Sequence, residues 1–151
     1  MKGALPVLGL AAALAVAPGG FAQGQQQKSG QNALIAVAAD KANFQEIRPG
    51  VSMATLWGNP DKGRYGAFTR FTSGFDAGTH THTNDVWLVV LKGADLYRDD
   101  AGEKRVAAGE FIRIPGKHKH WSGGDPTEGA LFYQESSGKF DLQSDGTELR
   151  R

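Results

Sequence analysis

Two short stretches decide how this chain of 151 residues folds: GFDAGTHTH at residues 74–82 and GEFIRIPGKHKH at residues 109–120. They contain all four histidines of the chain, which are His80, His82, His118 and His120. In an extended strand, residues i and i+2 point to the same side, so each His-x-His pair can present two imidazole rings to one point. Neutral imidazole is the commonest side-chain ligand of transition metals. The spacing therefore predicts a metal site built from both stretches.

Short apolar runs separated by turn residues surround these two stretches. The runs that we interpret as strands are Phe44–Ile47, Val51–Trp57, Tyr65–Thr72, Val86–Leu91, Asp95–Arg98, Glu110–Ile114 and Ala130–Glu135. Gly, Asn, Asp and Pro cluster between them, as in GNPDKG at residues 58–63, and these residues favour tight turns. Many short strands at this spacing predict an all-β fold, an antiparallel sandwich or small barrel. The alanine-rich segment Ala33–Lys41 fits a short helix and an added strand equally well.

The run Val86–Leu91 is apolar at every position. A strand that faces solvent on one side alternates between apolar and polar residues, so we expect both faces of this strand to be covered. The cover over Trp87, Val89 and Leu91 is either the N-terminal segment of the same chain or a second subunit. The second alternative predicts a homodimer.

Composition and charge narrow the class of protein. With 17 Lys and Arg against 16 Asp and Glu, the formal net charge is +1, which offers no electrostatic argument for binding nucleic acid. The chain has no cysteine, which excludes disulfides, a thiolate nucleophile and a zinc site built on sulfur. The length and the ordinary share of charged residues, 22%, predict one globular domain.

The first 22 residues have the pattern of a secretory signal peptide. A basic start is followed by an apolar run over residues 5–17 and by small residues before Ala22. The run is shorter than the roughly 20 residues that span a bilayer. We therefore expect cleavage after Ala22 and export to a bacterial periplasm or the medium, with no membrane anchor left. The further division that we expect is a flexible polar leader at residues 23–32, the folded domain at 33–142 and a disordered tail at 143–151.

The glycine, proline and histidine positions of the two stretches resemble the two motifs of the cupin superfamily, Gly-x5-His-x-His-x3-4-Glu-x6-Gly and Gly-x5-Pro-x-Gly-x2-His-x3-Asn. The resemblance covers residues 74 to about 124 and implies a double-stranded β-helix, the jelly-roll barrel of cupins. More narrowly, segments around Trp57, Tyr65 and His82 look like small bacterial single-domain cupins close to the ChrR type. The metal ligands that the resemblance implies are His80, His82 and His120. The turn positions that it implies are Gly74, Gly93, Gly109 and Pro115.

In the second motif, Lys117 and Gly124 stand where the cupin pattern has Gly and Asn. The chain also departs from the pattern at the motif glutamate. That position falls at Val86, or at Trp87 with the longer spacing, and neither side chain can bind a metal. A three-histidine site with open positions and a site with His118 as a fourth ligand both remain open. Asp85 is a weaker candidate because strand alternation turns it outward. The expected cofactor is one divalent transition-metal ion: Zn, Fe, Ni, Cu or Mn.

Polar residues on neighbouring strands complete the expected site. Tyr133, Gln134 and Arg70 are candidates for binding a small-molecule ligand or substrate, because an inward polar side chain must be paired or serve a ligand. An outward, solvated orientation of Tyr133 and Arg70 is the alternative.

The expected site is compatible with two functions. One is a metal-dependent enzyme with dioxygenase, isomerase or lyase chemistry, and the other is a non-catalytic, metal-dependent module that binds or senses a small ligand.

Overall fold

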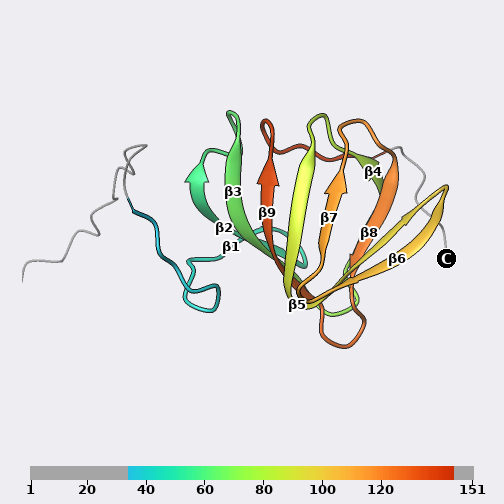
Figure 1. The fold of residues 1–151 in the computed structure, drawn as a ribbon, viewed down its shortest axis with the longest axis horizontal. Helices are drawn as coiled ribbons and strands as arrows, with labels where there is room; N and C mark the ends of the chain where they lie inside the picture. The colour runs from blue at the N-terminus through green and yellow to red at the C-terminus, as the bar shows by residue number, and fades with distance from the viewer. Residues whose placement is uncertain (1–33, 145–151) are drawn as a thin grey trace, which may run out of the picture.

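The computed structural model describes residues 34–144, and the regular elements in this part of the chain are all β-strands, curled into a barrel (Figure 1). The strands are β1 (Gln45–Arg48), β2 (Val51–Gly58), β3 (Tyr65–Phe71), β4 (Asp76–Thr81), β5 (Val86–Asp99), β6 (Gly102–Ala107), β7 (Phe111–Ile114), β8 (His120–Gly124), β9 (Ala130–Ser136) and β10 (Gln143–Ser144). Their order is β1-β2-β3-β9-β5-β8-β4-β10, β6 and β7 also pair with β5, and all pairs are antiparallel. The predicted all-β jelly-roll fold is confirmed. No helix within residues 34–144 has the length and apolar character needed to cross a membrane.

The long strand β5 joins the two halves of the barrel. Its first half pairs with β7 and β9, and its second half pairs with β6 and β8. The strand bends at Gly93, which has a φ of 68° and follows a register shift between Val90 and Lys92. The sequence pattern predicted two strands here because the KGA stretch around Gly93 looks like a break. One strand instead passes from one sheet to the other through the glycine.

Alanine at position 93 is expected to destabilise the protein by about 3 kcal/mol, because a side chain at positive φ is strained and a clash adds to that strain. A Cβ atom there would lie 2.2 Å from the backbone oxygen of Gly129. Gly109→Ala is the matched control, since Gly109 has a φ of 88° but open space around it. Urea unfolding of both variants separates the strain from the clash. Equal losses of stability would contradict the role of the close approach.

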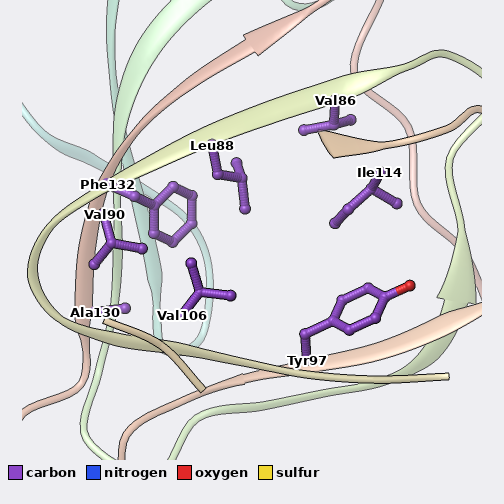
Figure 2. Packing of buried hydrophobic residues seen from close by; sticks show 8 residues of the cluster. All are labelled: Val86, Leu88, Val90, Tyr97, Val106, Ile114, Ala130 and Phe132. Carbon is purple, nitrogen blue, oxygen red and sulfur yellow. The ribbon is translucent and has the colours of Figure 1, made fainter. Parts of the chain in front are cut away.

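The hydrophobic core fills the space between the two sheets (Figure 2). Its buried members are Val86, Leu88, Val90, Tyr97, Val106, Ile114, Ala130 and Phe132. Alternate residues of β5 and β9 point inward, so strand periodicity places their apolar side chains on one face. Burying a side chain such as Phe132 stabilises the fold by about 2–3 kcal/mol. Four members of this core, Val86, Leu88, Ile114 and Phe132, also line the cavity that is described below.

Three regions differ from the sequence-based expectations or qualify them. Residues 34–44 form neither a helix nor a strand, and they run beside β1 and β2, away from β5 (Figure 1). The described part of this segment therefore does not cover the outer face of β5, where Leu91 is 43% exposed. A homodimer through that face stays a prediction.

The expected disordered tail, residues 143–151, begins with the short strand β10, which pairs with β4. Residues 1–33, with the expected signal peptide and polar leader, and residues 145–151 lie outside the described part of the chain.

Candidate metal centre

Two neighbouring strands bring three of the four histidines together. His80 lies on β4 and faces His120 at the start of β8 as its strand partner, with ring centroids 4.3 Å apart. His82 follows the end of β4, and its ring centroid lies 4.9 Å from that of His80. One ring nitrogen from each histidine lies within 4.8 Å of the other two. The two quoted stretches therefore meet at one point, as their spacing predicts.

Backbone carbonyl groups orient the three rings. The hydrogen bonds join Nδ1 of His80 to the oxygen of Gly78, Nδ1 of His82 to that of Asp141, and Nδ1 of His120 to that of His118. Because a carbonyl oxygen can only accept, each Nδ1 carries the ring proton and each Nε2 keeps its lone pair. Metal-binding histidines commonly have this arrangement, in which the second nitrogen donates to a fixed acceptor.

The histidine cluster is neutral because it is buried. Burial lowers the pKa of His80 and of His120 to about 4 and also lowers that of His82, since charged imidazole is poorly solvated there. Nε2 of His120 is buried and has no hydrogen-bond partner within residues 34–144. A buried nitrogen with a free lone pair calls for a partner that accepts electrons. The three residues therefore fit a transition-metal ion and could hold one.

The fourth histidine points elsewhere. His118 follows Lys117, which has a φ of 63°, so the segment turns here rather than staying extended. Its Nε2 lies 2.9 Å from a carboxylate oxygen of Asp99, which also accepts a hydrogen bond from the hydroxyl of Tyr97. These two hydrogen bonds lower the pKa of Asp99 to about 2. His118 is thus placed beside the cluster, bound to Asp99, and not within the group of three.

Residues 140–142, which follow β9, also contact the site: Phe140 and Leu142 line its cavity, and Asp141 holds His82. The side chain of Asp141 accepts hydrogen bonds from the amide and hydroxyl groups of Thr83, which fixes the carbonyl that orients His82. Phe140 packs against the rings of His82 and Tyr65. The sequence pattern did not indicate this role for residues 140–141, because they lie far from the histidines in the chain.

The cluster lines a cavity of about 50 Å³, enough for a few water molecules or a small organic group. Gln134 lines it, held by the hydroxyl groups of Thr69 and Tyr65, and its role in binding a ligand stays a prediction. The other two predicted ligand-binding residues do not line it. Tyr133 alternates to the outer face, where it bonds Trp57 and Glu135, and Arg70 stacks on the ring of Phe44, 3.6 Å from its centroid. Successive side chains of a strand point to opposite faces, so Tyr133 points away from the cavity that its neighbour Gln134 lines, and Arg70 away from the cavity that Thr69 lines. This alternation explains both corrections.

Two charged residues of the cavity were missed in the sequence. Besides the three histidines, the titratable side chains that line it within residues 34–144 are Arg48 and Asp95. Arg48 stacks over Phe75 and is close enough to His80 to lower its pKa further. Asp95 is buried on β5. Asp85, the weaker metal-ligand candidate of the sequence, forms an ion pair with Arg113 and accepts a hydrogen bond from the amide of Gly116, and it is not part of the histidine cluster.

Solved structures of low sequence identity share this fold. The polyketide cyclase RemF from Streptomyces resistomycificus matches with a TM-score of 0.63 and 16% identity, over 78% of this chain and 89% of that one. KdgF from Halomonas sp. matches with a TM-score of 0.54 and 19% identity, over 65% and 90%. The structure of Rhodobacter sphaeroides SigE in complex with the anti-sigma ChrR matches with a TM-score of 0.53 and 16% identity, over 64% and 49%.

Sequence comparison is more specific than this shared fold. No curated protein sequence matches the chain significantly. The model of the ChrR cupin-like domain matches residues 32–138, which contain every strand except β10 and all three clustered histidines. The chain therefore belongs to the ChrR cupin-like family of the cupin superfamily.

Proposed function

We propose that the protein binds one divalent transition-metal ion through His80, His82 and His120 and uses it to bind or transform a small molecule. The observation that carries this proposal is the cluster of three neutral rings, each with Nδ1 committed to a backbone carbonyl. When bound by three neutral imidazoles, such an ion keeps its positive charge and open positions, and can polarise a carbonyl group or activate water or oxygen.

The residues around the cluster support a small, partly polar ligand. Apolar side chains from several strands form most of the cavity wall and exclude water, while Gln134 and Thr69 offer fixed hydrogen-bonding groups. Arg48 adds a positive charge beside His80. An oxygen-rich or anionic group of the ligand is therefore expected at this end of the cavity.

As an enzyme, the protein would use dioxygenase, isomerase or lyase chemistry on such a molecule. RemF is a polyketide cyclase, which supports small-molecule chemistry as one use of this fold. A fold alone does not fix the reaction. The reaction class therefore depends on which compounds bind and whether they change.

A non-catalytic ligand-binding or sensing module is the second candidate. It is supported by the small number of titratable groups besides the three histidines: the only such groups that line the cavity within residues 34–144 are Arg48 and Asp95, and proton transfer to a ligand needs such a group in reach of the reacting atoms. Membership of the ChrR cupin-like family also supports it, since a solved structure of similar fold contains the anti-sigma ChrR bound to SigE. Export and homodimer formation stay predictions from the sequence.

Titration of metal-free protein with Zn²⁺, Ni²⁺ and Fe²⁺ in a calorimeter tests metal binding. We expect one equivalent to bind, and binding of none would refute the proposal. The loaded protein is then mixed with a panel of diketones, thiols and phenols under air, with oxygen uptake and product formation followed together. Conversion of a compound identifies an enzyme, whereas tight binding without conversion supports the sensing module.

A further inference from the structure

The most unusual side chain of the cavity is Asp95. It is 1% exposed, it lines the cavity, and neither of its carboxylate oxygens has a hydrogen-bond partner within residues 34–144. Leaving a buried polar group unpaired costs about 1–3 kcal/mol, and more for a charged group. A residue kept at this cost at the edge of a cavity requires an explanation.

The neighbours of Asp95 in the barrel explain why the protein itself provides no partner. Its strand partners are Val106 on β6 and Gly124 on β8, and neither has a side chain that can form a hydrogen bond. Most of the other residues that line the cavity are apolar, such as Leu88 on β5 and Phe132 on β9. The carboxyl group is thus directed toward space that only water or a ligand can fill.

The position of Asp95 separates it from the metal centre. Its partner on β8 is Gly124, four residues along that strand from His120. Asp95 is accordingly not among the three residues that could hold the ion. A group bound there contacts a different part of the ligand from the part near the histidines.

The chemistry of a carboxyl group defines what it would bind. When ionised it only accepts hydrogen bonds, and when protonated it still keeps acceptor capacity on its carbonyl oxygen. The ionised form is therefore satisfied by a group that donates, such as a hydroxyl or an amine, whereas the O–H of the protonated form also donates to an acceptor. A ligand with an apolar body and one such donor would match the lining of this part of the cavity.

We infer that Asp95 is a ligand-binding residue, which holds a hydroxyl or amine group of the small molecule at the end of the cavity remote from the histidines. This inference deepens the proposed function by assigning a chemical class to the ligand. It depends on the cavity and on the ligand-binding part of that function, but not on the presence of the metal.

Three small probes of similar size test the inference: 1-propanol, n-propylamine and ethyl methyl ether, which cannot donate a hydrogen bond. Their affinities are measured at pH 8.5, where the carboxyl group of Asp95 is ionised and cannot donate to the ether oxygen, by NMR titration of metal-free and Zn²⁺-loaded protein. The titration follows the amide signals of Ser122 and Gln134 in the cavity wall. We expect the alcohol or the amine to bind about 5–10-fold more tightly than the ether, the value of one hydrogen bond. Preference for the alcohol identifies a hydroxyl ligand, and preference for the amine a basic one.

Two variants keep the test specific. Asp95→Val should abolish the preference for donors, and Asp95→Asn, which retains an acceptor oxygen, should preserve part of it. Equal affinities of all three probes in the wild type, or an unchanged preference in Asp95→Val, would overturn the inference. Zn²⁺ binding is measured on the same samples. If the wild type binds no Zn²⁺ but still prefers the probes that donate a hydrogen bond, the metal site is refuted and the inference about Asp95 stands.

If none of the probes enters, the stability of metal-free Asp95→Val decides. A carboxyl group kept for a ligand costs stability in its absence, so the variant should unfold at a higher urea concentration than the wild type. A lower midpoint would show that Asp95 supports the fold, through buried water, and would overturn the inference.

Discussion

His120→Ala is expected to weaken Zn²⁺ binding by at least about 100-fold, because it removes one of three converging nitrogens. Changes to residues that only orient a ligand already reduce metal affinity by about 10–100-fold, so loss of a ligand itself should exceed that range. Nε2 of His120 is the buried nitrogen without a hydrogen-bond partner in the described part of the chain, so its only expected function is binding the ion. The affinity is measured by calorimetry with competition by a chelator.

His118→Ala is the matched control for this experiment. Its imidazole binds Asp99, while its backbone carbonyl, which orients His120, is kept in the variant. We therefore expect the affinity of His118→Ala to stay within about tenfold of the wild type. Full metal binding by His120→Ala would contradict the assignment of the three ligands. Equal losses in the two variants would make His118 a fourth ligand.

Asp95→Asn is expected to change how stability depends on pH. Burial raises the pKa of Asp95 from 3.8 to about 7 in the folded protein. Between these values the folded state binds more protons than the unfolded state, so the stability contributed by this group is full below about pH 4 and is lost as the pH rises to about 7. Asp95→Asn lacks this loss, so between pH 4 and pH 8 it should gain about 4 kcal/mol of stability relative to the wild type.

Urea unfolding of metal-free wild type and Asp95→Asn at several pH values measures this difference. Groups with the opposite behaviour, such as Asp99 with its lowered pKa, are common to both proteins and cancel in the comparison. Parallel stability curves over this pH range would show that Asp95 is ionised in the folded state at an ordinary pKa.

Local periodicity was enough to predict the fold class and most of the strands. The runs that became β2, β3 and β9 have strand-forming residues bounded by Gly, Asn and Pro, so their limits were predicted to within one or two residues. The strands β4, β6 and β8 were missed. β6 is mostly polar, and β4 and β8 are rich in glycine, histidine and small residues. β4 and β8 pair with each other, and β6 and β8 pair with β5. Such tertiary pairing overrides local propensity and has no local pattern.

The spacing of the two His-x-His pairs predicted a metal site, and the cupin resemblance implied His80, His82 and His120 as its ligands, with His118 left open. The residues that complete the cavity depend on which face each strand turns inward. Gln134 faces the cavity and Tyr133 faces away from it, and the sequence offered no means to choose between these neighbours. Asp95 was missed because an aspartate near a predicted turn usually faces solvent, and only the bend of β5 at Gly93 makes its position internal.

A crystal structure of the Zn²⁺-loaded protein, with anomalous diffraction measured on both sides of the zinc edge, tests the metal centre most directly. We expect one anomalous peak enclosed by His80, His82 and His120, with Nε2 of each ring about 2.0–2.1 Å from it. His118 should remain bound to Asp99 in that structure. A fully loaded crystal with no peak between the three rings, or with the ion held by His118 and Asp99, would rule out the three-histidine centre.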